Sequence, residues 1–434
     1  MFVVIGGRRM EIKKITVSGF RNISSCEFDI DGITGLLAVN SFGKSNILKA
    51  IEFGFEFINA PNNSKDLLLG WTQGFPKNVF ISTPEFSFDV LLGYSKGSKK
   101  YDVKYGFSFE WRINDNKGGR VKNEYLMIKE ISNKQKFSYF LKRENFDCFG
   151  KYRTSETGRC DKKISIKSNE LIINKLLAFD ELFYFDIIEK LNDFQIYVDR
   201  HLDSARAYEI EPIIRKDIDD LKLATADNIP RTLYKLKEKY RDKYEYLMDI
   251  YLQLFPKIDN IQVKRFKISG SPDTSGIPDE FEFIEYAYLL FCKEKNMNSE
   301  INFQGMSDGA KRILLLLTNL ILADINGVSL FCVEEPENCI NPSLFQKYIE
   351  VIHDLRGHVK IIITSHSPYL VNYLDPREIY IGCNNDKDLA EFKRIKKTSI
   401  NKLYADSQRF NVDYAEYLFD LFANSDEDLN KYVE

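Results

Sequence analysis

Residues 38–45 (AVNSFGKS) carry residue types that can hold a phosphate group. An apolar run at 33–37, typical of a buried strand, precedes them, and an apolar helical pattern follows. A strand, a glycine-containing loop, Lys-Ser and a helix form the layout of a P-loop. Lys44 would place a positive charge beside loop N–H groups, and the Ser45 hydroxyl could ligate Mg²⁺. These residues predict a site for a nucleoside triphosphate, with contacts from Asn40, Ser41, Gly43, Lys44, Ser45 and Asn46.

One position of this segment departs from the usual pattern, because Ala38 stands where the first glycine is expected. That place needs a tight turn, and alanine adds only a methyl group. Taken alone, the segment could also be an ordinary turn that matches the pattern by chance.

A second segment, residues 330–337 (LFCVEEPE), is an apolar run that ends in carboxylates. Glu334 at the end of such a strand would hold Mg²⁺, and Glu335 could orient or deprotonate an attacking water. Aspartate is more usual at the first place. The alternative is a strand that runs into an acidic surface loop.

Two further segments could complete a phosphate site. Ser307 is expected to cap the helix that follows it, so that Asp308 and Gly309 lie at a helix start able to face an anion. His366 follows the apolar run 361–364 and could hydrogen-bond a terminal phosphate or the attacking water. Each segment alone also reads as an ordinary cap or loop.

The elements that would position these residues indicate an α/β fold. Residues 78–130 alternate apolar and polar positions between turn signals, which predicts an antiparallel meander. Residues 168–256 turn to helical spacing, and strands and helices alternate afterwards. We expect three domains: an N-terminal lobe with the P-loop and the meander (1–167), an inserted helical lobe (168–256) and a C-terminal ATPase lobe (257–434).

Composition narrows the class of protein. The chain has 434 residues, of which 44% are apolar, enough for a sizeable core. Its 61 basic and 64 acidic residues give a net charge of −3, which excludes a globally basic nucleic-acid binder. The 7 cysteines show no C-x-x-C spacing and the longest apolar run is too short to span a membrane, so we expect a cytoplasmic protein without membrane contact.

One stretch is locally basic and carries interleaved aromatic residues, which can bind nucleic acid through phosphates and stacked bases. A solvated face with rings packed inward is the alternative. The residues of this expected nucleic-acid or partner patch are Lys134, Lys136, Lys142, Arg143, Lys162 and Lys163.

In this order the four segments resemble the motifs of ABC-type ATPases of the SMC/RecF/OLD kind, over roughly residues 10–385. Residues 38–45 match Walker A, 307–310 the signature motif, 334–337 Walker B, and 364–368 the switch-histidine segment. The glutamine of the family's Q-loop is not evident, with Gln73 as a weak candidate.

The resemblance implies a P-loop NTPase head of the ABC type with an N-terminal antiparallel β lobe and an inserted helical lobe. It implies ATP and Mg²⁺ as cofactors, with Glu335 and His366 in catalysis and Ser45 and Glu334 on the metal. In such ATPases two heads enclose ATP, and the signature residues act in trans. A homodimer or higher homo-oligomer is therefore expected, with Ser307, Asp308 and Gly309 facing the partner's nucleotide.

The chain also resembles compact members without a TOPRIM nuclease domain, as in the anti-phage systems PARIS and Septu. That implies an ATP-driven sensor or scaffold that controls a separate effector, a toxin or a nuclease. Two alternatives remain: a RecF-like DNA-repair ATPase, and a scaffold that binds ATP with little turnover.

Overall fold

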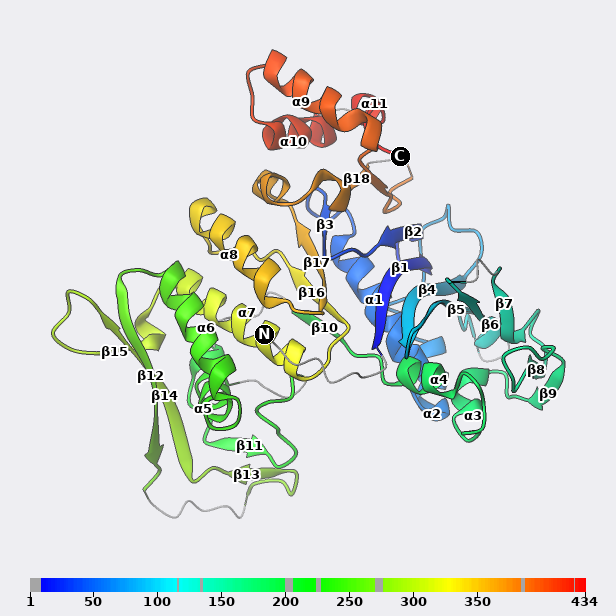
Figure 1. Ribbon diagram of the computed structural model, residues 1–434, viewed down its shortest axis with the longest axis horizontal. Helices are drawn as coiled ribbons and strands as arrows, with labels where there is room; N and C mark the ends of the chain where they lie inside the picture. The colour runs from blue at the N-terminus through cyan, green and yellow to red at the C-terminus, as the bar shows by residue number, and fades with distance from the viewer. Residues whose placement is uncertain are drawn as a thin grey trace. The chain divides into compact units, whose positions relative to one another are not determined.

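The computed structural model describes residues 9–114, 117–132, 136–199, 206–223, 228–269, 276–383, 387–424 and 426–434. The chain divides into two compact units (Figure 1). Unit 1 comprises Met1–Val198 and Lys360–Glu434, and unit 2 comprises Asp199–Val359. Helices and strands mix in both, which confirms the expected α/β class. These bounds differ from the three domains expected from the sequence, which remain a prediction.

Unit 1 contains an eight-stranded antiparallel sheet in the order β2-β1-β4-β5-β6-β7-β8-β9. Buried and half-buried residues alternate along β4, as the period of a strand with one covered face requires. The meander expected within residues 78–130 is confirmed as β4, β5 and β6. The strands are β1 (Arg9–Phe20), β2 (Ile23–Asp29), β4 (Glu85–Lys96), β5 (Lys99–Glu110), β6 (Arg120–Glu130), β7 (Ser138–Arg143), β8 (Phe149–Tyr152) and β9 (Lys162–Ser165).

Helix α1 (Lys44–Asn59) covers the inner face of this sheet through an aromatic core. The ring of Phe53 lies 5.0 Å from Phe86 and 5.4 Å from Trp111, measured between centroids. Gly54 lets Phe88 approach the helix, since a Cβ there would lie 2.3 Å from the Phe88 ring. Buried aromatic area of this kind is the main stabilising term for such a layer.

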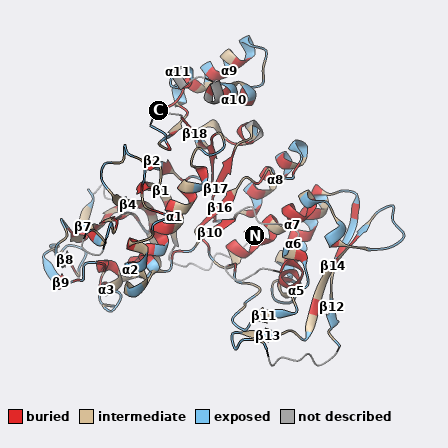
Figure 2. Cartoon of the chain, turned by 180° about the vertical axis from the view of Figure 1, so that it is seen from behind, coloured by how far each residue is buried: buried red, intermediate tan, exposed pale blue. Residues whose placement is uncertain are grey.

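A second set of strands in unit 1 carries the P-loop. Strand β3 (Ile33–Leu37) is buried throughout and pairs in parallel with β17 (Lys360–Ser365) on one side and β18 (Ile379–Gly382) on the other. Strand β19 (Phe392–Arg394) pairs antiparallel with β18. Figure 2 shows buried residues along β17 and α1, as expected for parallel strands covered on both faces.

The remaining elements of unit 1 are short, and strand β10 (Ile196–Asp199) begins in unit 1 and ends at the first residue of unit 2. The helices are α2 (Asn62–Leu69), α3 (Ile172–Leu176), α4 (Phe185–Asn192), η3 (Pro368–Tyr373), η4 (Pro376–Glu378), η5 (Lys397–Ser399), α9 (Ile400–Arg409), α10 (Tyr414–Asn424) and α11 (Asp426–Leu429).

Unit 2 is built around α7 (Asp308–Ile325), which is apolar on almost every side and therefore buried. Arg312 lies inside this core, 1% exposed, and forms an ion pair of 2.9 Å with Asp199. The other elements of unit 2 are η1 (Arg206–Tyr208), β11 (Ile213–Arg215), α5 (Ile229–Lys239), α6 (Arg241–Leu254), β12 (Ile258–Lys267), β13 (Phe281–Phe283), β14 (Tyr286–Glu294), β15 (Ile301–Asn302), η2 (Phe303–Gly305), β16 (Leu330–Glu334) and α8 (Pro342–Leu355).

Three features considered in the sequence can be compared with the structure. The stretch 168–256 does hold α3, α4, α5 and α6, but β10 and β11 interrupt it, so it is not purely helical. No helix in the described residues is long and apolar enough to cross a membrane. All 7 cysteines lie in the described part of the chain, and none forms a disulfide.

Candidate functional site

The P-loop is a tight turn between β3 and α1. Gly43 takes a φ of 122°, and a Cβ there would lie 2.9 Å from the Cβ of Ala390, so a side chain would be both strained and crowded. Ser41 adopts a left-handed φ of 64°. Asn40, Ser41 and Ser45 are exposed, which leaves the loop surface open to an anion.

The side chain of Lys44 bridges the loop. It is only 6% exposed, and its ammonium donates to the carbonyl oxygens of Ala38 at 2.7 Å and Val39 at 3.1 Å. The positive charge is therefore held inside the turn of residues 38–44, next to the first N–H groups of α1. Such a concentration of donors and positive potential at a helix N-terminus is suited to phosphate.

His366 belongs to the same unit and lies beside the start of the loop. Strand β17 pairs in parallel with β3 up to Ser365 and Leu37, and the N–H of Ala38 donates to the Ser365 carbonyl at 3.3 Å. His366 is the next residue after Ser365 and is half-buried. The structure thus brings together two of the segments expected to act on one nucleotide.

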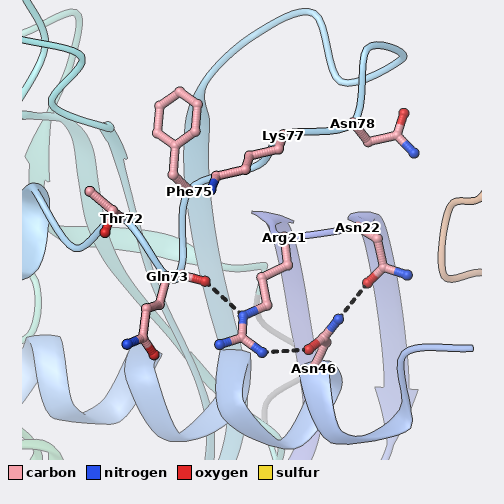
Figure 3. Close-up of a pocket in the computed structure, with 8 residues that line it drawn as sticks. All are labelled: Arg21, Asn22, Asn46, Thr72, Gln73, Phe75, Lys77 and Asn78. Carbon is pink, nitrogen blue, oxygen red and sulfur yellow. Dashed lines mark hydrogen bonds between the residues drawn. The ribbon is translucent and has the colours of Figure 1, made fainter. Parts of the chain in front are cut away.

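A pocket of about 490 Å³ opens next to the loop. Arg21 lies at its centre, where it donates to the Gln73 carbonyl at 2.7 Å and to Asn46 Oδ1 at 2.7 Å (Figure 3). Asn46 in turn donates to Asn22 at 2.8 Å. The lining residues are Arg21, Asn22, Asn46, Thr72, Gln73, Phe75, Lys77 and Asn78.

Sequence reasoning missed most of this pocket. Arg21 and Asn22 are not among the residues that the sequence predicts for the site, and Gln73 is only a weak candidate for the Q-loop glutamine. The sequence did contain one signal for the pocket: Arg21 and Asn22 are two polar residues with several hydrogen-bond donors, and they lie shortly before the P-loop strand. The Asn46 side chain connects Arg21 and Asn22 to the first turn of α1, because its amide accepts from Arg21 and donates to Asn22.

Unit 2 carries the acidic segment. Glu334 ends β16, and its buried Oε1 has no hydrogen-bond partner among the described residues, so this carboxylate oxygen is suited to a cation. Glu335 takes a left-handed φ of 44°, and the Asn338 amide donates to its Oε2 at 3.2 Å. Backbone strain at a carboxylate of this kind fits a functional position.

Unit 2 also carries the helix start at 307–309. The Ser307 hydroxyl caps α7 by accepting from the Ala310 N–H at 3.3 Å, as predicted. Asp308 pairs with Lys311 at 2.9 Å. Ser307 and Asp308 are exposed, so this helix start lies at the surface of its unit.

The donor set fits Mg²⁺ held jointly with a substrate. In the described residues no group of three or more His, Cys, Asp or Glu side chains could hold a metal ion alone. Mg²⁺ is usually bound by one or two carboxylates, waters and substrate phosphates, so the Ser45 hydroxyl and the Glu334 carboxylate are each of a type that could contribute one ligand. Each of these two residues lies in a different unit.

The expected basic patch is only partly exposed. The prediction is wrong for Arg143, which is 3% exposed and donates to the Glu170 carbonyl at 3.1 Å inside the core. Lys136, Lys162 and Lys163 are exposed, and Lys142 is half-exposed beside Glu144. Lys134 lies outside the described residues.

Comparison with known proteins identifies one family. The model of the family described as "AAA domain, putative AbiEii toxin, Type IV TA system" matches residues 39–372. No curated protein matches the chain.

Several solved structures are similar at low identity. The structure of "the SmcHead bound to the C-winged helix domain of ScpA" is 11% identical, with 90% of this chain and 99% of that one covered and a TM-score of 0.47. The SMC head domain from Thermotoga maritima is 10% identical, with coverage of 89% and 99% and a TM-score of 0.41. The Pyrococcus furiosus Smc head with an extended coiled coil, bound to the C-terminal domain of ScpA, is 10% identical, with coverage of 92% and 100% and a TM-score of 0.46.

Proposed function

Because the chain belongs to the AAA-domain family whose model matches residues 39–372, we propose that it binds and hydrolyses ATP as a P-loop ATPase of the SMC/ABC kind. The observation that carries this proposal is the geometry of Lys44. Its ammonium is held within the loop, and that loop lies beside His366 through the Ala38–Ser365 hydrogen bond. A buried positive charge next to the N-terminus of a helix favours the binding of an anion such as phosphate.

In the proposed reaction, water attacks the γ-phosphorus, the bond to the β–γ bridging oxygen breaks, and ADP leaves. Lys44 and the loop N–H groups stabilise the charge on the phosphate oxygens. Glu335 accepts the proton of the attacking water, and His366 hydrogen-bonds the γ-phosphate. Bound Mg²⁺, held by Ser45 and Glu334, would neutralise part of the phosphate charge.

We propose that two or more copies enclose the nucleotide. The helix start at Ser307, Asp308 and Gly309 supports this, because Ser307 and Asp308 are exposed and the first N–H groups of α7 could complete a second copy's site at the γ-phosphate. ATP would then stabilise the closed homo-oligomer, and hydrolysis would release it. Closure driven by a ligand needs only that the ligand bind one state more tightly.

The biological role we propose is that of a sensor or scaffold that holds an effector protein, a toxin or a nuclease, and releases it on infection. The family description, which refers to a toxin of a type IV toxin–antitoxin system, supports a defence context. The test is to co-express the chain with the product of a neighbouring gene and to follow the complex by size-exclusion chromatography with and without ATP. A complex whose stability changes with ATP is expected, and the absence of any complex with each neighbouring product would reject the role.

A DNA-repair ATPase is the second candidate, and the exposed Lys163 of β9 favours it. It predicts that duplex DNA stimulates ATP turnover, whereas the sensor does not need DNA for turnover. An ATP-bound scaffold is the third, and it predicts nucleotide binding with no measurable turnover. A single assay of phosphate release, with and without duplex DNA, separates the three.

A further inference from the structure

Three lysines lie directly opposite one another on neighbouring strands of the unit 1 sheet. The register pairs Lys142 on β7 with Lys151 on β8, and Lys151 with Lys163 on β9. We call these residues the lysine row. Directly opposed residues project from the same face of a sheet, and like charges in such pairs are destabilising. Figure 1 shows these strands at the end of the sheet that is farthest from β2.

Acidic side chains do little to neutralise this row. Lys142 is 3.3 Å from Glu144, an exposed carboxylate, so that ion pair is weak in water. In the described part of the chain, neither Lys151 nor Lys163 has an acidic partner within ion-pair distance. Within the described residues, the row is therefore a site of positive potential whose one acidic partner is the exposed Glu144.

Aromatic rings share this face with the lysines. Tyr139 is 45% exposed, and the ammonium of Lys142 lies 5.4 Å from its ring centroid. Phe149 precedes Lys151 by two residues and so projects from the same face, with the Lys163 ammonium 4.8 Å from its ring. The β7 register places Tyr139 opposite Met127 and Lys142 opposite Tyr125, which puts both on one side.

We propose that this face binds single-stranded nucleic acid, with phosphates along the lysine row and bases on Tyr139 and Phe149. An open sheet face with lysines and accessible rings is the arrangement that single strands use. A duplex would use the lysines alone, because its base faces are already stacked. This proposal does not rest on the proposed ATP chemistry, since none of these residues belongs to the P-loop or its pocket.

The first experiment measures binding of a labelled single-stranded oligonucleotide to the full chain over a range of salt. The variant Lys163→Ala is compared with Lys162→Ala, a matched control on the same strand whose side chain projects from the other face. We expect Lys163→Ala to weaken binding clearly more than Lys162→Ala does. The double variant Lys151→Ala/Lys163→Ala should make the negative slope of log affinity against log salt shallower by roughly 1.4, about 0.7 for each lost phosphate contact.

A second variant tests stacking. Tyr139→Leu keeps an apolar side chain and should reduce affinity for the single strand by at least about fivefold without changing the salt slope. Three results would overturn the proposal: equal effects of Lys162→Ala and Lys163→Ala, binding of a same-length duplex at least as tight as that of the single strand, or equal binding of a polyglutamate peptide. The unfolding midpoint of each variant checks that the sheet is intact.

Discussion

The carbonyl oxygen of Cys339 lies 2.5 Å from the point that a Cβ atom would occupy on Gly309. The turn after the acidic segment therefore packs against the first turn of α7, within unit 2, and only glycine permits that approach. Cys339 itself takes a left-handed φ of 67°, a backbone conformation that is uncommon for residues other than glycine.

We expect Gly309→Ala to destabilise the protein by roughly 1–3 kcal/mol, because the added methyl group must displace backbone. Urea denaturation measures the effect. Gly305→Ala is the control, since no atom of the described residues lies within 4 Å of a Cβ at that position. Equal stability of the two variants would mean that the contact between Gly309 and Cys339 is not tight in solution.

Lys44→Ala should weaken ATP binding by at least about tenfold, because charge-assisted hydrogen bonds are worth about 1.5–3 kcal/mol. Titration with a fluorescent ATP analogue provides the measurement. Lys49→Ala, on the same helix α1, is the control and should leave affinity unchanged. An unaltered affinity in Lys44→Ala would refute the phosphate role of the loop.

The position of this loop was predictable because its signal is local: strand, turn and helix follow one another in the chain. The pocket beside it was not, because Arg21, Asn46 and Gln73 come from three segments that only the fold brings together. Arg143 was misjudged for a different reason. The sequence placed Arg143 in the patch by its charge alone. A bulge in the register of β7 leaves Phe140 and Leu141 both buried, and Arg143 then lies on the covered face.

Arg21→Ala should raise the KM for ATP several-fold while kcat changes little, because the guanidinium orders Asn46 and the Gln73 backbone rather than reacting groups. Steady-state phosphate release over a range of ATP concentrations gives both constants. Arg112→Ala removes a half-exposed arginine of the same unit, paired with Asp66, and serves as the control. A fall in kcat with unchanged KM would place Arg21 in the chemical step instead.

Glu335→Gln should slow ATP turnover by about 10²–10⁴-fold, the usual loss when a general base is removed, and should leave ATP binding intact. Glu350→Gln on α8, an exposed acid, is the control. Turnover that survives in Glu335→Gln would show that another group activates the water. A protein that binds ATP but has no turnover before mutation would instead fit the scaffold.

Glu124 predicts a pH dependence of stability. Burial raises its pKa from 4.5 to about 7, although the N–H groups of Ile172 and Ile173 and the Tyr105 hydroxyl donate to it. The native state therefore keeps this proton up to higher pH than the unfolded state does. The contribution of Glu124 to the free energy of unfolding is present below about pH 4.5 and is lost as pH rises towards 7, by at most about 1.4 kcal/mol per unit.

Urea denaturation at about pH 5 and about pH 7 tests this effect. Glu124→Gln, which has no proton to lose, should show a smaller decrease in stability over this interval than the unmodified protein. Glu144→Gln, an exposed carboxylate on the neighbouring segment, should retain the original decrease. An identical pH dependence in all three proteins would exclude Glu124 as its source.

The segment 387–390 packs against the nucleotide loop and its pocket. Asn78 donates to the Lys387 carbonyl at 2.7 Å, the Ala390 N–H donates to the Asn22 carbonyl at 2.9 Å, and Ala390 fills the space next to Gly43. A binding event that moves residues 387–390 would remove these contacts and loosen the turn at Gly43, which we propose holds the phosphate. A protein that binds the segment 387–390 would therefore change nucleotide affinity through the contact between Ala390 and Gly43.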